Sequence, residues 1–69
     1  MKFTVILEPQ EEGGFTVSVP ALPGCISEGG NREEALKNIK EAIELYLEVL
    51  KEEGKPIPKD VGEEILLDA

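Results

Sequence analysis

The sequence contains no histidine, and its only cysteine is Cys25. Without histidine the chain lacks the side chain that most often transfers protons in catalysis at neutral pH, and it cannot form a Ser–His or Cys–His nucleophile pair. A lone cysteine cannot close an intramolecular disulfide, and the usual ligands of a structural zinc site are missing. The sequence therefore predicts a protein that is not an enzyme and that binds no metal and no cofactor.

Carboxylate clusters on strands, which are the remaining way to hold a catalytic metal, are also lacking. The predicted strands carry Glu8 and Glu28, with Glu63 and Glu64 near the last one, whereas the positions expected to face inward are apolar. The sequence has two glycine pairs, at residues 13–14 and 29–30. Neither belongs to a phosphate-binding motif, because the P-loop lysine and the dinucleotide fingerprint are absent. Cys25 has no neighbour that would activate it, and we interpret it as a small core residue.

Long hydrophobic runs are absent as well. Apolar runs are short, as at residues 5–7, and Lys2 is not followed by the apolar stretch of a signal peptide. We therefore expect a cytoplasmic protein without a membrane partner, and a single free thiol agrees with that compartment.

Basic residues are few. Seven lysines and arginines stand against fifteen acids, which gives a net charge of −8 and an isoelectric point near 4.4. Such a surface repels phosphate backbones, so we expect no direct nucleic-acid binding and a basic protein as the partner. The alternative is that the charge only keeps the chain soluble.

The acids are spread along the sequence without a break in composition, and we expect a single domain over residues 1–69. A chain of this size buries only about 60% of its unfolded surface. Because no disulfide or metal is expected to add to its core, burial against a partner becomes the remaining source of stability. This reasoning predicts a homodimer or a larger homo-oligomer.

Alternating apolar residues predict three strands, over residues 2–8, 15–19 and 25–28. A glycine pair connects the first two as a hairpin. Two prolines and a glycine break the chain over residues 20–24. The inward face of the third strand stays open, because Cys25 and Ile26 are both apolar.

A long helix is predicted over residues 31–53. Asn31 and Glu34 have the form of a capping box, and Gly54 followed by Pro56 ends the helix. Apolar residues recur between these signals at steps of three and four, forming a stripe of Ala35, Leu36, Ile39, Ala42, Ile43, Tyr46, Leu47 and Leu50.

Residues 55–58 contain two prolines and predict an extended connector. Residues 63–68 predict a last short strand, with a helical turn as the alternative. The expected fold class is α+β in the order β-β-β-α-β: a three-stranded antiparallel meander, a fourth strand parallel to the first, and one long helix on one face. The helix is longer than the strands, and its overhanging half predicts an oligomer interface formed by Tyr46, Leu47, Val49 and Leu50.

One pattern in the sequence is distinctive. It contains Pro-Ala-Leu-Pro-Gly-Cys at residues 20–25, Glu-Glu-Ala at residues 33–35 and Pro-Ile-Pro at residues 56–58. The pattern resembles the HicB-like antitoxin family, of the stand-alone UPF0150 type, over nearly the whole chain. The resemblance implies a partial ribonuclease-H-like fold, and no ribonuclease activity is expected because the carboxylate set is absent.

The resemblance also implies a partner. It implies an antitoxin that binds and blocks a HicA-type toxin, which is a small basic protein that cleaves messenger RNA with a catalytic histidine. Complementary charge speeds such an encounter and orients it. Many family members carry a C-terminal DNA-binding domain, and we expect none within residues 1–69, so that operator binding by this chain is not expected.

The candidate contacts with the toxin are exposed acids around the first hairpin and on the third strand, namely Glu8, Glu11, Glu12 and Glu28. Two alternatives remain open. The chain is an orphan oligomeric module without a toxin, or it is a regulatory domain that binds a small ligand in the groove between helix and sheet.

Overall fold

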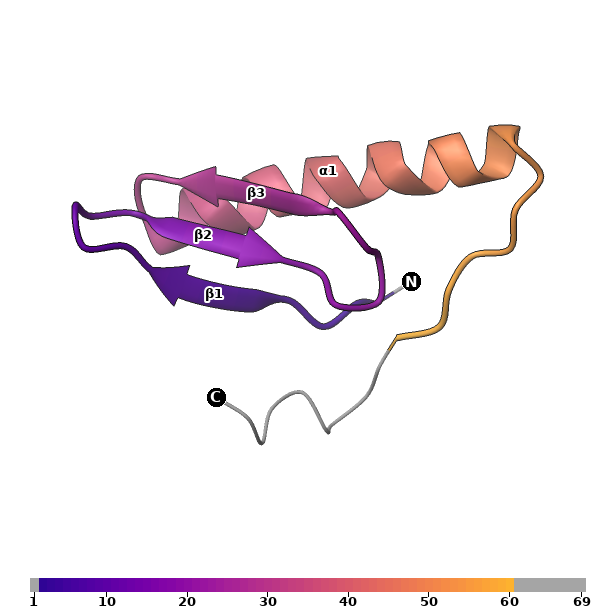
Figure 1. Ribbon diagram of the computed structural model, residues 1–69. Coiled ribbons are helices and arrows are strands. Elements are labelled where there is room, and N and C mark those ends of the chain that lie inside the picture. The colour runs from indigo at the N-terminus through magenta and orange to yellow at the C-terminus, as the bar shows by residue number, and fades with distance from the viewer. Residues whose placement is uncertain (1, 61–69) are drawn as a thin grey trace.

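The structure is a computed structural model that describes residues 2–60. Three strands, β1 (Ile6–Pro9), β2 (Phe15–Ser18) and β3 (Ile26–Gly29), precede one long helix, α1 (Arg32–Glu52). The strands form an antiparallel sheet in the order β1-β2-β3, and α1 lies along one face of it (Figure 1). The predicted α+β class, with a three-stranded meander followed by a helix, is confirmed. The predicted fourth strand, at residues 63–68, lies outside the described residues.

The first hairpin is shorter than the sequence predicts. Its turn is closed by two backbone hydrogen bonds, from Gly13 N to Gln10 O and from Gln10 N to Gly14 O, both 3.0 Å long. Pairing begins at Ile6, opposite Ser18, rather than at residue 2. The reason is that the chain leaves β2 into a proline turn directly after Ser18, and the residues before Ile6 therefore have no β2 residues to pair with.

The segment between β2 and β3 consists of two consecutive β-turns. Val19 O accepts a hydrogen bond from Leu22 N (3.0 Å), and Leu22 O accepts one from Cys25 N (2.9 Å). A proline occupies the second position of each turn, and Gly24 follows in the second turn with a φ of 82°, which is the pattern of a type II turn. The distinctive motif at residues 20–25 therefore builds a double turn that drives Leu22 and Cys25 into the core.

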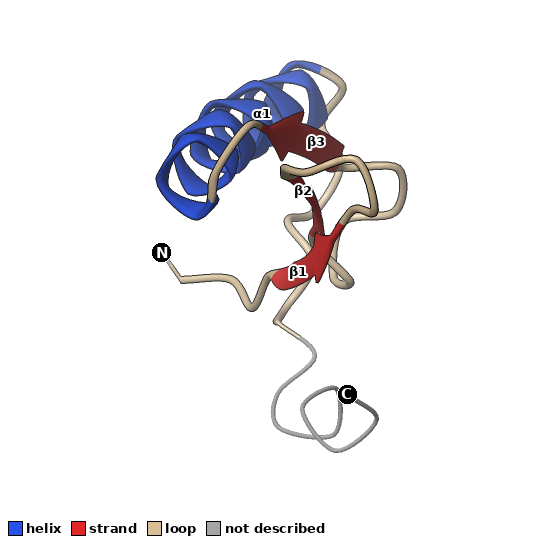
Figure 2. Ribbon diagram, turned by 90° about the vertical axis from the view of Figure 1, so that its left-hand side faces the viewer, coloured by secondary structure: helices blue, strands red, loops and turns tan. Residues whose placement is uncertain are grey.

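The core lies between the sheet and α1. Its buried residues are Val17, Val19, Leu22, Cys25, Ala35 and Ile39. The helix packs against β3 and β2 and leaves β1 on the far side (Figure 2). The structure also decides the inward face of β3, because Cys25 is buried whereas Ile26 is 62% exposed. Our interpretation of Cys25 as a core residue is confirmed.

The N-terminus of α1 is capped as the sequence predicts. Asn31 Oδ1 accepts a hydrogen bond from Glu34 N (2.8 Å), and Glu34 Oε1 accepts one from Gly30 N (2.6 Å). The second bond reaches one residue further back than in a standard capping box. Gly29, at the end of β3, touches the first turn of the helix, with its Cα hydrogen pointing at the backbone of Ala35.

The C-terminus of α1 ends in a Schellman motif around Gly54. Gly54 N donates to Lys51 O (3.1 Å), and Lys55 N donates to Leu50 O (2.9 Å). The helix predicted over residues 31–53 is therefore confirmed, with its two end residues acting as caps. At 1.5 Å per residue the helix is roughly 31 Å long and extends well past the four-residue strands (Figure 1).

The connector after α1 turns back toward the N-terminal segment. Residues 55–58 have neither helix nor strand, as predicted. Asp60 then accepts two hydrogen bonds from Thr4, one from its backbone N–H (2.8 Å) and one from its hydroxyl (2.7 Å). These bonds hold the connector beside the start of β1.

Candidate partner-binding site

Two of the four predicted toxin contacts lie at the same level of the sheet, on the two strands that flank β2. Glu8 on β1 and Glu28 on β3 both pair with Thr16 on β2. Because the neighbouring Val17 faces the helix, these three residues face the opposite side, which we call the outer face of the sheet. Both glutamates are exposed. The outer face therefore presents two carboxylates across roughly 10 Å, the width of two strand spacings.

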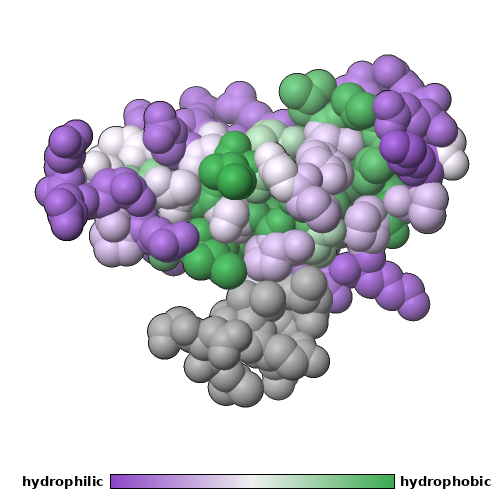
Figure 3. Space-filling model, in the orientation of Figure 1, coloured by the Kyte–Doolittle hydropathy of each residue, from purple (hydrophilic) through white to green (hydrophobic). Residues whose placement is uncertain are grey.

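The other predicted contacts, Glu11 and Glu12, lie in the turn between β1 and β2. A depression of about 570 Å³ at this end of the sheet is lined by Glu12, Glu28 and Glu34, together with glycines of both adjoining turns. The structure thus brings Glu12 and Glu28 together, whereas Glu8 and Glu11 stand outside the depression. In the space-filling view this end of the molecule, on the left, is hydrophilic (Figure 3).

Glu34 is a site residue that sequence reasoning missed. Its capping role was visible in the sequence, but its place beside Glu12 follows only from the position of the hairpin next to the helix N-terminus. Over residues 3–36 the chain holds six glutamates and a single base, Arg32. We call this region, which comprises the β1–β2 turn, the outer face and the first turn of α1, the acidic end. It attracts a cationic surface, most strongly at low salt.

An apolar groove lies at the opposite end, between the C-terminal half of α1 and the start of β3. It has a volume of about 460 Å³, and its lining includes Ile26, Leu45, Tyr46, Val49 and Leu50. Three of these side chains are well exposed: Ile26 at 62%, Leu45 at 63% and Val49 at 44%. Apolar residues accordingly reach the surface over the sheet and beside the C-terminal half of α1 (Figure 3).

The four residues predicted as an oligomer interface do not share one surface. Tyr46, Val49 and Leu50 line the groove beside β3. Leu47 lies on the other flank of α1, in a second groove that also contains Phe3. Sequence reasoning missed Leu45 and Ile26. The signal for Leu45 was its spacing of four residues from Val49, off the main stripe, whereas nothing local decides the orientation of Ile26.

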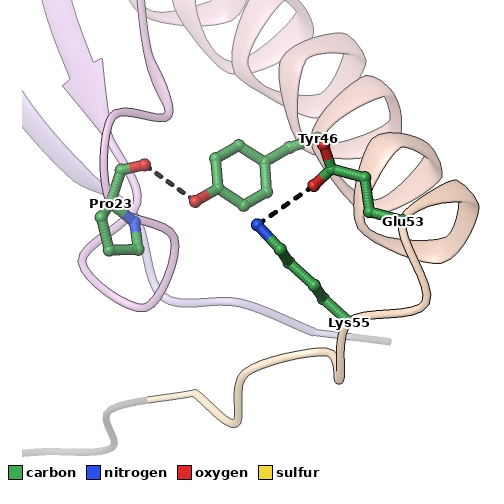
Figure 4. A network of polar contacts seen from close by, with 4 residues as sticks. All are labelled: Pro23, Tyr46, Glu53 and Lys55. Atoms are coloured by element: carbon green, nitrogen blue, oxygen red, sulfur yellow. Dashed lines mark hydrogen bonds and ion pairs between the residues drawn. The ribbon is translucent and has the colours of Figure 1, made fainter.

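Tyr46 connects the helix to the double turn. Its hydroxyl donates a hydrogen bond of 2.9 Å to Pro23 O, and Lys55 forms an ion pair of 3.3 Å with Glu53 near it (Figure 4). Both ion-pair partners are more than half exposed, so this pair contributes little to stability. The buried Cys25 also lines the groove, and burial raises the pKa of its thiol. A protonated, buried thiol is a poor nucleophile, which agrees with a structural role.

Within residues 2–60, no group of three or more Cys, Asp and Glu side chains is arranged to hold a metal ion. In the same part of the chain, no helix combines the length and the apolarity that are needed to cross a membrane. What this part of the surface offers is a set of exposed charges and an apolar groove on each flank of α1, which suits recognition of another macromolecule.

Comparison with known proteins agrees with the motif. Residues 3–66 match the family described as the HicB-like antitoxin of bacterial toxin–antitoxin systems. The UPF0150 protein Ta0767 of Thermoplasma acidophilum is 52% identical over 69 residues, an alignment that covers all of both chains. A UPF0150 protein of Archaeoglobus fulgidus is 46% identical over 65 residues, covering 91% of this chain and 94% of the relative.

A further relative is named for its function. Antitoxin HicB 1 of Photorhabdus laumondii is 39% identical over 66 residues, which cover 93% of this chain and 43% of that antitoxin. The resemblance seen in the motifs at residues 20–25 and 56–58 is thus confirmed by matches over nearly the whole sequence. The chain belongs to the HicB-like antitoxin family.

Proposed function

We propose that this protein is an antitoxin that inhibits a HicA-type, messenger-RNA-cleaving toxin by covering its basic RNA-binding surface. The observation that carries the proposal is the acidic end, in which glutamates from three elements of the chain face solvent together. Such a surface mimics the negative charge of RNA and competes for the same cationic residues. The inhibition is non-enzymatic and takes place in the cytoplasm, where messenger RNA is the toxin's substrate.

The test is RNA cleavage by a purified HicA-type toxin, with and without an equal concentration of the antitoxin. We expect cleavage to stop and a complex to form. A double charge reversal, Glu11→Lys with Glu12→Lys, should slow association and weaken its dependence on salt. The matched pair is Glu12→Lys alone and Glu44→Lys, each of which changes the net charge by the same amount. Glu44 lies on α1 beside Lys40, outside the acidic end, and its reversal should leave inhibition intact. Undiminished cleavage without a complex at tens of micromolar would refute the proposal.

The complete fold that we propose is the partial ribonuclease-H-like one, with residues 63–68 as a strand parallel to β1. The paired hydrogen bonds between Thr4 and Asp60 support this topology, because they bring the connector to the start of β1. Nuclear Overhauser contacts between residues 63–68 and residues 3–7 would establish the strand. Helical chemical shifts over residues 63–68 would refute it.

We also propose that the protein self-associates, and we assign the contact to the flank of α1 that bears Leu47. The groove on this flank measures about 440 Å³ and is bordered by one base, Lys40, and one acid, Glu44. A two-fold axis through such a mixed border allows each lysine to face the glutamate of the other copy. Sedimentation equilibrium of the protein and of Leu47→Gln measures this contact, and a monomeric wild-type protein would exclude it.

A further inference from the structure

Three large apolar side chains around the groove beside β3 are exposed to water. Ile26, Leu45 and Val49 each expose more than two fifths of their surface, and they meet around one depression of about 460 Å³. Exposed apolar side chains that gather at one depression commonly mark a binding surface. The volume falls at the lower end of the range for ligand-binding clefts and suits one or two large side chains of a partner.

The charges around this groove are of one sign. On a helix, the surface neighbours of a residue are those three and four positions away. The charged neighbours of Leu45 and Val49 in this sense are Glu41, Glu48, Glu52 and Glu53, and all are acids. The lysines of α1 at positions 37, 40 and 51 follow the opposite flank by the same spacing.

The lining of the groove itself carries one pair of opposite charges. Of the described residues that line the groove, Lys55 is the one base, and it is paired with Glu53. The groove is therefore an apolar patch with an acidic border.

The acidic border of the groove favours one kind of binding partner over another. A second copy docked here about a two-fold axis would set this groove against the same groove and would bring the acidic borders of the two copies face to face. Like charges across an interface are unfavourable, whereas a cationic border on the partner would pair with each of them. The charge pattern thus favours a basic partner that contributes a large apolar side chain.

The edge of β3 indicates how that partner is bound. Cys25 O accepts a hydrogen bond from Val19 N. Along an antiparallel strand every second residue bonds to the neighbouring strand, so residues 25, 27 and 29 face β2 and Glu28 directs its backbone groups away from it. One acceptor at this edge is already used, because Asn38 Nδ2 donates a hydrogen bond of 2.7 Å to Glu28 O. An added strand would lose that acceptor, and a helix laid in the groove needs none of these backbone groups.

From these observations we propose that the groove between α1 and β3 binds a basic amphipathic helix, whose apolar face seats on Leu45 and Val49 and whose cations pair with the glutamates around them. The inference rests on the proposed function in one respect, since it takes this helix to belong to the inhibited toxin. It adds a second contact region, separate from the acidic end, that lengthens the life of the complex through apolar burial.

The test uses Leu45→Gln combined with Val49→Gln. Both side chains are exposed, so these changes should leave the fold intact, which circular dichroism verifies. We expect toxin affinity to fall at least about tenfold, chiefly through faster dissociation. Glu48→Lys should weaken binding as well. Glu44→Lys lies in the proposed self-association contact on the opposite flank, so it should weaken self-association and leave toxin affinity unchanged.

The outcomes separate the two proposals. If the toxin is still bound and inhibited by the groove variants but not by the Glu11 and Glu12 reversals, the groove inference is wrong and the proposed function stands. A dimeric wild type that Leu45→Gln converts to a monomer would also overturn it, because a copy would then occupy the groove.

A second probe does not depend on the toxin. A synthetic helical peptide of leucine and lysine should shift the amide resonances of Ile26, Leu45 and Val49, and a leucine–glutamate peptide should not. Shifts confined to the acidic end would refute the inference. If the toxin does not bind at all while the lysine peptide shifts these three resonances, the proposed function fails and the groove remains a site for basic helices.

Discussion

Replacing Gly29 by alanine tests how α1 is seated on the sheet. A methyl group at this position would lie 2.7 Å from Ala35 Cα and 2.8 Å from the carbonyl carbon of Glu34, and closer still to Ala35 N. These are backbone atoms of the first helical turn, so no side chain can move aside. The helix N-terminus must shift away from β3, which loosens the fully buried Ala35 and strains the Asn31 cap.

The magnitude follows from these contacts. Overpacking typically costs 1–3 kcal/mol and loss of a cap about 1 kcal/mol, offset by roughly 0.5 kcal/mol from stiffening the unfolded chain. We expect Gly29→Ala to lower the free energy of unfolding by about 1.5–3.5 kcal/mol, out of the roughly 3–10 kcal/mol that is typical of this size. Urea titration followed by far-ultraviolet circular dichroism measures the change.

Gly24→Ala is the matched control. A methyl group at Gly24 would meet nothing within 4 Å, but the φ of 82° disfavours any L side chain. We expect a loss of about 1 kcal/mol, because the left-handed conformation costs alanine roughly 1–2 kcal/mol. Asparagine, which tolerates this conformation, should cost less at Gly24 and should not rescue Gly29. A smaller loss for Gly29→Ala than for Gly24→Ala would refute the packing argument.

Three further predictions concern stability. Tyr46→Phe removes the hydrogen bond to Pro23 O and should lower the free energy of unfolding by about 0.5–1.5 kcal/mol in a urea titration; an unchanged midpoint would mean that the bond contributes nothing. Asn31→Ala should cost about 1 kcal/mol in the same assay and Asn31→Ser much less, and equal losses would argue against capping. Because burial raises the pKa of the Cys25 thiol, the folded state keeps this proton more tightly than the unfolded state, whose thiol has a pKa near 9. The stability that this proton contributes is complete below the unfolded pKa and is lost as the pH rises through the folded pKa. The free energy of unfolding of the wild type should therefore fall more between about pH 8 and pH 10 than that of Cys25→Ala. Parallel losses in the two proteins would contradict this.

Part of the candidate site is predictable from the sequence, and part depends on how the elements pack. Glu8, Glu11, Glu12 and Glu28 were found from charge and expected exposure, and all four are exposed. Their arrangement was not predictable, because Glu28 joins Glu12 only when β3 pairs with β2 and the hairpin turn comes to rest beside the helix N-terminus. The groove between α1 and β3 is predictable only in part for the same reason. Val49 stands off the main apolar stripe of the helix, whereas Ile26 reaches the groove from β3.

The helix and the turns follow from local patterns in the amino-acid sequence. A capping asparagine, a three-to-four spacing of apolar residues and a glycine stop act over distances of at most five residues, so they specify α1 without contacts between residues far apart in the chain. The prolines and Gly24 act equally locally in the double turn. Local patterns do not specify that Cys25 rather than Ile26 faces the core, or that Leu47 and Val49 occupy opposite flanks of α1. Those choices depend on strand register and on where the helix lies over the sheet, and both are set by contacts between residues far apart in the chain.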